Sequence, residues 1–173
     1  LAHAKAGVVA HRLVDWADVV IESFVPGVAE KHGVDYATLA KRKPGLVMLS
    51  SCMRGQTGPE RRYTGFGMQG AALSGFVAVT GWPDRMPSGP WGAYTDFITP
   101  RFAVAAILAA LDYRRRTGIG QHLDMSQLEV SLHFIAPALL DYALNGREGS
   151  RVGNREPEVG PQAPLPCRGQ GRR

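Results

Sequence analysis

Asp96 is the residue whose position most clearly suggests chemistry. It lies in the segment 92–97, between a loop rich in proline and glycine and a long apolar segment that favours a helix. A carboxylate at a loop-to-helix junction can be reached by a ligand, and it can act as a nucleophile toward an activated acyl group. The same position suits an ordinary helix N-cap, and spacing alone favours that simpler role.

Two loops that follow expected strands are candidate ligand-binding segments. Residues 55–59, Gly-Gln-Thr-Gly-Pro, follow an expected strand at 46–51, and Pro26-Gly27 follows one at 18–22. Loops at strand ends gather ligands in α/β proteins, although the same residues also form plain turns. Lys31, shortly after Pro26-Gly27, suits either a phosphate contact or a solvated surface.

Other reactive groups give weaker signals. Cys52 follows a strand and is a possible nucleophile, but a half-buried structural thiol is favoured. The five histidines and two cysteines show no metal-ligand spacing, so no metal site is expected. Gly65, Gly67 and Gly70 match the dinucleotide-binding spacing, but no strand precedes them, and we interpret the match as accidental.

The elements that must position these residues alternate between helices and short strands. Residues 4–16 have helical periodicity, with Val8, Val9, Leu13 and Trp16 on one face. A buried parallel strand is expected at 18–22, a helical turn at 28–32, a helix from the Asp35 cap through Lys43, and a second buried strand at 46–51. This order predicts a doubly wound α/β sheet.

The second half continues the pattern. The sequence predicts a small-residue helix at 67–79, a surface loop at 82–91, a long helix at 100–116 and a third strand at 121–125. Ser126, with Glu129 three residues later, predicts a capped helix that runs to about Leu144.

Composition narrows the class of protein. The 173 residues are 45% apolar and 20% charged, which fits one folded domain and excludes a disordered chain. With two cysteines, a disulfide scaffold is excluded.

Six arginines and three glutamates from Gly146 onward supply most of the net charge of +5, so a nucleic-acid surface is not expected. The longest apolar run, 102–111, is half the length of a membrane span of about 20 residues, so we expect a cytoplasmic protein without a membrane partner.

Four segments, in order, resemble the class III CoA-transferase family, the group of formyl-CoA transferase, carnitine CoA-transferase and α-methylacyl-CoA racemase. They are residues 17–27, 55–59, 95–96 and 116–126. The resemblance covers roughly residues 5–168. It implies a Rossmann-like large domain, here incomplete, without the family's small domain. On this basis residues 1–146 are a partial CoA-binding and catalytic domain, and 147–173 are a linker with a truncated or aberrant tail.

The resemblance also implies a reaction. Asp96 takes the place of the family's catalytic aspartate, which exchanges CoA between carboxylic acids through covalent intermediates. Acyl-CoA is a substrate, no cofactor is bound permanently, and the family's chains form interlocked homodimers. The family's CoA contacts fall on Ser23, Phe24, Lys31, Cys52 and Met53, although Cys52 and Met53 depart from the residues common in the family.

Two alternatives remain open. The racemase branch has a histidine where this sequence has Phe66, and phenylalanine cannot exchange a proton. We therefore prefer a transferase to a racemase. The other alternative is an inactive, truncated remnant, because the chain by itself is expected to lack activity.

Overall fold

A computed structural model describes residues 3, 5–155, 159–162 and 165–169 of the protein. Among these residues, the fold is built around a three-stranded parallel sheet. The strands are β1 (Val19–Glu22), β2 (Val47–Cys52) and β3 (Gln121–Ser126), in the order β1-β2-β3. Val19 pairs with Val47 across β1 and β2, and Val47 pairs with Gln121 across β2 and β3. All three carboxyl ends therefore lie at one end of the sheet.

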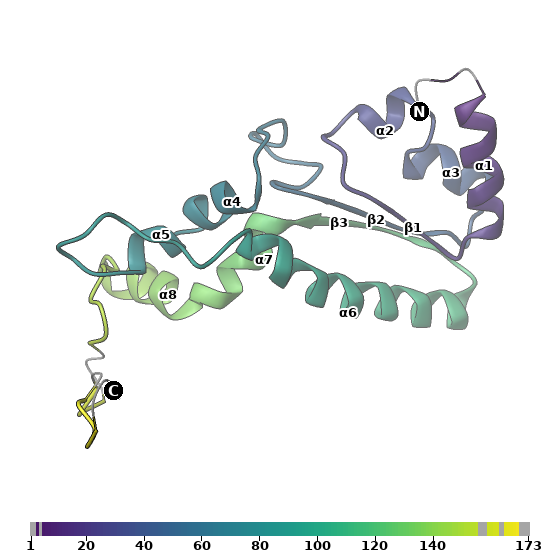
Figure 1. Cartoon of the computed structure of the whole chain (residues 1–173). Helices are drawn as coiled ribbons and strands as arrows, with labels where there is room; N and C mark the ends of the chain where they lie inside the picture. The colour runs from purple at the N-terminus through teal and green to yellow at the C-terminus, as the bar shows by residue number, and fades with distance from the viewer. Residues whose placement is uncertain (1–2, 4, 156–158, 163–164, 170–173) are drawn as a thin grey trace.

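Helices cover both faces of the sheet (Figure 1). One face carries α1 (Ala6–Trp16), α2 (Val28–Lys31) and α3 (Tyr36–Arg42). There Met48 of β2 packs with Val14 of α1 and Leu39 of α3 in the main buried cluster. The Asp35 side chain caps α3 by accepting a hydrogen bond from the Thr38 N–H at 2.9 Å, as predicted.

The opposite face of the sheet is covered by the long helix α6 (Tyr94–Thr117), which packs against β2 and β3. It begins six residues before the expected start and contains Pro100 inside it. By length and composition α6 is apolar enough to cross a membrane, with a hydropathy of 1.3 over 18 residues. In this structure one side of α6 packs on β2 and β3, and 22% of the apolar window is buried.

Short helices gather beyond the carboxyl end of the sheet. The expected helix 67–79 is two helices, α4 (Gly67–Leu73) and α5 (Phe76–Val79), because Gly75 adopts a φ of 97° between them. The expected helix 126–144 is also divided, into α7 (Gln127–Leu132), the 3₁₀ turn η1 (His133–Ile135) and α8 (Ala136–Asn145). The Ser126 hydroxyl caps α7 by accepting from the Glu129 N–H at 3.2 Å, as predicted.

The expectation that the first strand is buried is wrong, and the apolar face of α1 is not the side that packs inward. The predicted apolar face of α1 exists, but Val8, Val9, Leu13 and Trp16 are exposed and Val14 is the buried residue. Strand β1 is only partly buried, and Ile21 is 61% exposed. Strand β1 is an edge strand, and α6 packs against β2 and β3 on the opposite face of the sheet.

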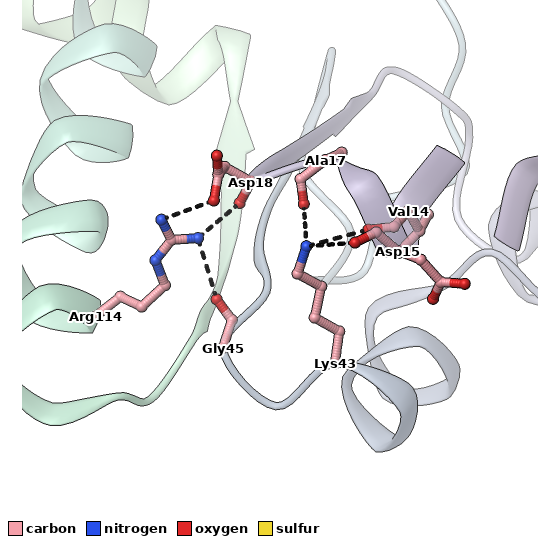
Figure 2. A network of polar contacts seen from close by, with 7 residues as sticks. All are labelled: Val14, Asp15, Ala17, Asp18, Lys43, Gly45 and Arg114. Carbon is pink, nitrogen blue, oxygen red and sulfur yellow. Dashed lines mark hydrogen bonds and ion pairs between the residues drawn. The ribbon is translucent and has the colours of Figure 1, made fainter. Parts of the chain in front are cut away.

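The amino ends of the strands are held by two basic side chains (Figure 2). The Lys43 ammonium donates to the carbonyls of Val14, Asp15 and Ala17 at the end of α1, at 3.3, 3.1 and 2.5 Å. The Arg114 guanidinium donates to the Asp18 carboxylate at 3.0 Å and to the Asp18 carbonyl at 3.2 Å. A third bond, at 3.5 Å, reaches the Gly45 carbonyl. These contacts join α1, α3 and α6 at the end of the sheet opposite the carboxyl ends.

Candidate functional site

Asp96 occupies the first turn of α6. The N-cap of this helix is Ala93, so the interpretation of Asp96 as an N-cap is wrong, and its carboxylate lies in the first turn, where a helix favours negative charge. Its backbone N–H bonds the Ala93 carbonyl at 3.0 Å. Pro100, four residues later, has no N–H to donate to the Asp96 carbonyl.

Helix α4 fixes the start of α6. The Thr95 side chain is fully buried, and its hydroxyl donates to the Gly67 carbonyl at 3.1 Å. A Cβ atom at position 67 would lie 2.6 Å from the Asp96 Oδ2, and one at position 70 would lie 2.9 Å from the Thr95 Oγ1. Glycine at both positions therefore allows α4 to approach Asp96 and Thr95 closely.

The exposed Asp96 carboxylate lines a cavity of about 180 Å³ at the carboxyl ends of β1 and β2. The cavity brings together Asp96 and three of the predicted CoA-binding residues, Ser23, Cys52 and Met53. Its other lining residues are Val25, Ser51, Arg54, Arg61, Tyr63, Thr64, Gly65, Phe66 and Gln127. Ser23, which follows β1, and Met53, which follows β2, thus line the same cavity as Asp96 in the first turn of α6.

The two remaining predicted CoA-binding residues lie outside this cavity. Phe24 follows β1 and lines a separate apolar groove beside α1, with Leu13 and Trp16. Lys31 is the exposed last residue of α2. The structure therefore divides the predicted CoA contacts between the Asp96 cavity and the surface near β1 and α2.

The Gly-Gln-Thr-Gly-Pro loop connects the carboxyl ends of all three strands. The Gln56 N–H donates to the Asp124 Oδ1 of β3 at 2.7 Å, and its side-chain amide donates to the Phe24 carbonyl at 3.1 Å. The same amide lies 3.7 Å from the Cys52 Sγ. Gly55, with a φ of 78°, makes the turn into this loop. The loop therefore holds the ends of the strands around the cavity.

Burial raises the pKa of the Cys52 thiol, and the negative charges of Asp124 and Glu22 act in the same direction, against hydrogen bonds from the Arg54 and Gly55 N–H groups. A thiol with a raised pKa is mostly protonated near neutral pH, and a protonated thiol is a poor nucleophile. Asp96 is therefore the better candidate nucleophile in the cavity.

Sequence reasoning missed two cationic residues of the cavity, Arg54 and Arg61. The Arg54 side chain is 15% exposed and forms an ion pair with Glu60. Arg54 lies two residues after β2, and this position could have marked it as a candidate, because ligand-binding residues gather at strand ends. Within the described residues, no group of three or more histidine, cysteine, aspartate or glutamate side chains is arranged to hold a metal ion.

The sequence pattern of CoA-transferase family III matches residues 1–171. The chain therefore belongs to this family, and its helices and parallel sheet match the family's fold.

Relatives with named activities support the assignment to this family. A succinate–glutarate CoA-transferase of Agrobacterium fabrum is 39% identical over 90% of this chain. An acetyl-CoA:oxalate CoA-transferase of Acetobacter aceti is 38% identical over 86% of it. The chain spans 39% of the length of each of these two relatives.

Solved structures agree with the fold. A CaiB/BaiF family protein from Brucella suis superposes with a TM-score of 0.86 at 35% identity, over 92% of this chain and 42% of that one. The protein Rv3272 from Mycobacterium tuberculosis superposes with a TM-score of 0.77 at 28% identity, over 83% of this chain and 40% of that one.

Proposed function

We propose that the whole protein is a CoA-transferase that moves CoA between carboxylic acids, with Asp96 as its nucleophile. The observation that carries this proposal is the exposed Asp96 carboxylate in a cavity at the carboxyl ends of two parallel strands. Family membership and relatives named as CoA-transferases support it.

The proposed reaction begins when an Asp96 carboxylate oxygen attacks the thioester carbonyl of the donor. A C–O bond forms, the C–S bond breaks, and CoA leaves as a thiolate from a mixed anhydride. The thiolate then attacks the Asp96 carbonyl, which forms an aspartyl-CoA thioester and releases the donor acid as a carboxylate. The acceptor carboxylate repeats both steps in reverse order, which regenerates Asp96. Covalent storage of the acyl energy avoids its loss to hydrolysis.

The size of the cavity supports a role in binding the acyl end of the substrate. A volume of about 180 Å³ is below the range of sites that enclose a drug-sized ligand, so the cavity suits the acyl end of the thioester. In this proposal Ser23, Cys52 and Met53 contact the pantetheine end near Asp96. Phe24 and Lys31, which lie outside the cavity, contact the more distant adenine and phosphate groups of CoA.

The cavity gives less support to a racemase. A racemase must remove a proton from the α-carbon and return it, which requires suitably placed bases. Among the described residues that line the cavity, Asp96 is the one carboxylate and none is a histidine. Phe66, at the position that distinguishes the racemase branch, is 82% exposed and has no titratable group.

We further propose that the whole protein works as a homodimer in the cytoplasm. Large apolar side chains on two helices remain exposed in the single chain. They are Val104 and Leu108 of α6, and Leu140 and Leu144 of α8. Apolar groups of this kind support a partner surface.

A transfer assay with matched aspartate variants of the whole protein tests the proposed function. Asp96→Asn removes the negative charge with little change in volume, and we expect it to abolish transfer of CoA to an added carboxylic acid. Asp84→Asn is the control, because Asp84 is exposed in the loop before α6 and does not line the cavity. Normal turnover by Asp96→Asn would contradict the proposal.

A further inference from the structure

Arg54 has an unused hydrogen-bond donor in a buried position. Its side chain is 15% exposed, it forms an ion pair with Glu60 through Nη1, and its Cζ lies 4.7 Å from the centre of the Tyr63 ring. The Nε atom is buried and has no hydrogen-bond partner among the described residues. An unpartnered buried donor on a charged group is costly, so such groups are normally paired.

Arg54 lines the same cavity as Asp96, and Arg61 lines it too. Glu60, the ion-pair partner, is 62% exposed and is not one of the residues that line this cavity. The Arg61 side chain is anchored by a bond from Nη1 to the Gly58 carbonyl at 3.1 Å. Two arginines therefore line a cavity whose described lining has one carboxylate, Asp96. Both arginines also line a neighbouring hollow, which Glu60 shares.

A guanidinium group presents planar N–H donors that match a carboxylate. Without these cations, the negative charge of Asp96 would repel a second anion in so small a space. A thioester group is uncharged at its reacting carbonyl and gives Arg54 no charge to bind. Besides the reacting carboxylate of the acceptor acid, the complementary ligand is an acyl group that carries another carboxylate at its far end.

We propose that Arg54, assisted by Arg61, binds the second carboxylate of a dicarboxylic acyl group while the thioester carbonyl faces Asp96. This specificity role rests on the proposed CoA-transferase function. It makes dicarboxylic acids the preferred substrates of the site.

A carboxylate is not the only anion that the whole substrate offers, since the phosphates of CoA have similar chemistry. A pair of unreactive CoA thioethers, carboxypropyl-CoA and butyl-CoA, separates the two sources. Both have the same CoA portion and a four-carbon chain, and they differ in the terminal carboxylate. Because neither can acylate Asp96, their binding affinities report on Arg54 even if the proposed reaction is wrong.

The experiment measures the affinity of both thioethers for the whole protein by calorimetry. We expect Arg54→Leu to weaken carboxypropyl-CoA binding by about 10- to 100-fold and to leave butyl-CoA binding unchanged. Arg54→Lys, which keeps the charge without the planar donors, is expected to restore part of the loss. Arg62→Leu is the control, since Arg62 is an exposed neighbour in the same loop and does not line the cavity.

Two results would overturn the inference. An equal loss for both thioethers, with an unchanged melting curve, would assign Arg54 to the CoA phosphates. Unchanged affinity for both would remove any role for Arg54 in binding. If Arg54→Leu does not fold, Arg61→Leu makes the same comparison, and loss of carboxypropyl-CoA affinity alone would support the proposal while any other pattern would contradict it.

Discussion

Gly67 and Asp96 lie so close together that residue 67 has no room for a side chain. A Cβ atom there would be 2.6 Å from the Asp96 Oδ2 and 2.6 Å from the Ala93 Cβ. The first residue of α4 therefore limits where the carboxylate of α6 can go. Helix α4, which we expected only to support the fold, therefore also positions Asp96, the proposed nucleophile.

Substitution Gly67→Ala is expected to displace Asp96 and to lower the rate of CoA transfer about 100-fold, because small misplacements of a reacting group have effects of that size. Alanine suits a helix better than glycine does, so a loss of activity will not reflect a weaker helix. Steady-state kinetics of the whole protein measures the effect. Gly7→Ala in α1 is the control, since no atom lies within 4 Å of a Cβ there. Equal activity of Gly67→Ala and the wild type would show that the contact does not position Asp96.

The raised pKa of Cys52 predicts slow alkylation near neutral pH. Burial is the main cause of the shift, and it disfavours the thiolate. The rate of reaction with iodoacetamide should therefore be low at pH 7 and should rise only above the ordinary thiol pKa of about 8.5. Cys167, which is exposed, provides an internal reference in the same digest. Faster labelling of Cys52 than of Cys167 at pH 7 would indicate an activated thiol.

The same reasoning predicts that Cys52→Ser keeps most of its CoA-transfer activity. Serine preserves the size of the side chain, and the proposed chemistry passes through Asp96. Complete loss of transfer with intact CoA binding would instead point to Cys52 as the nucleophile.

Lys43 is expected to stabilise the fold without affecting the site. Its ammonium group binds three carbonyls at the end of α1, at the amino ends of the strands (Figure 2). Lys43→Met should lower the free energy of unfolding by about 1–2 kcal/mol, because those carbonyls lose a charged donor. Chemical denaturation of the whole protein measures the change. Lys41→Met on the exposed side of α3 is the matched control, and an equal effect of both substitutions would contradict this role.

The local signals in the sequence predicted the three strands and two of the three proposed caps. Asp35 and Ser126 cap the helices that they were expected to cap. A Ser or Asp side chain directly before a segment with helical periodicity is a strong local signal for an N-cap. The start of α6 was placed too late, since Pro100 resembles a first-turn proline. Tertiary contacts explain the difference: Thr95 is buried and bonded to Gly67, and Ile98 and Thr99 are buried as well.

Part of the candidate site was less predictable. Arg54 belongs to none of the motifs, and its role depends on Tyr63, Glu60 and the cavity, which meet only after folding. The burial of β1 was also overestimated, because an edge strand and a central strand of a parallel sheet have similar sequences. Its neighbours, not its own residues, decide which it is.

Residues 1–173 expressed by themselves are expected to self-associate and to lack CoA-transfer activity. The exposed apolar side chains of α1, α6 and α8 would meet those of other copies. Analytical ultracentrifugation is the measurement, and polydisperse large species are the expected result. A compact, monodisperse monomer would show that these faces need no cover.

The most direct test of the central claim is mass analysis of the peptide that contains Asp96, after the whole protein is mixed briefly with an acyl-CoA and quenched in acid. The account predicts an added mass on Asp96, of either the acyl group or CoA, that hydroxylamine removes and that Asp96→Asn abolishes. Transfer of CoA with Asp96 unmodified at every time point, or an adduct that forms on another residue and persists in Asp96→Asn, would contradict it.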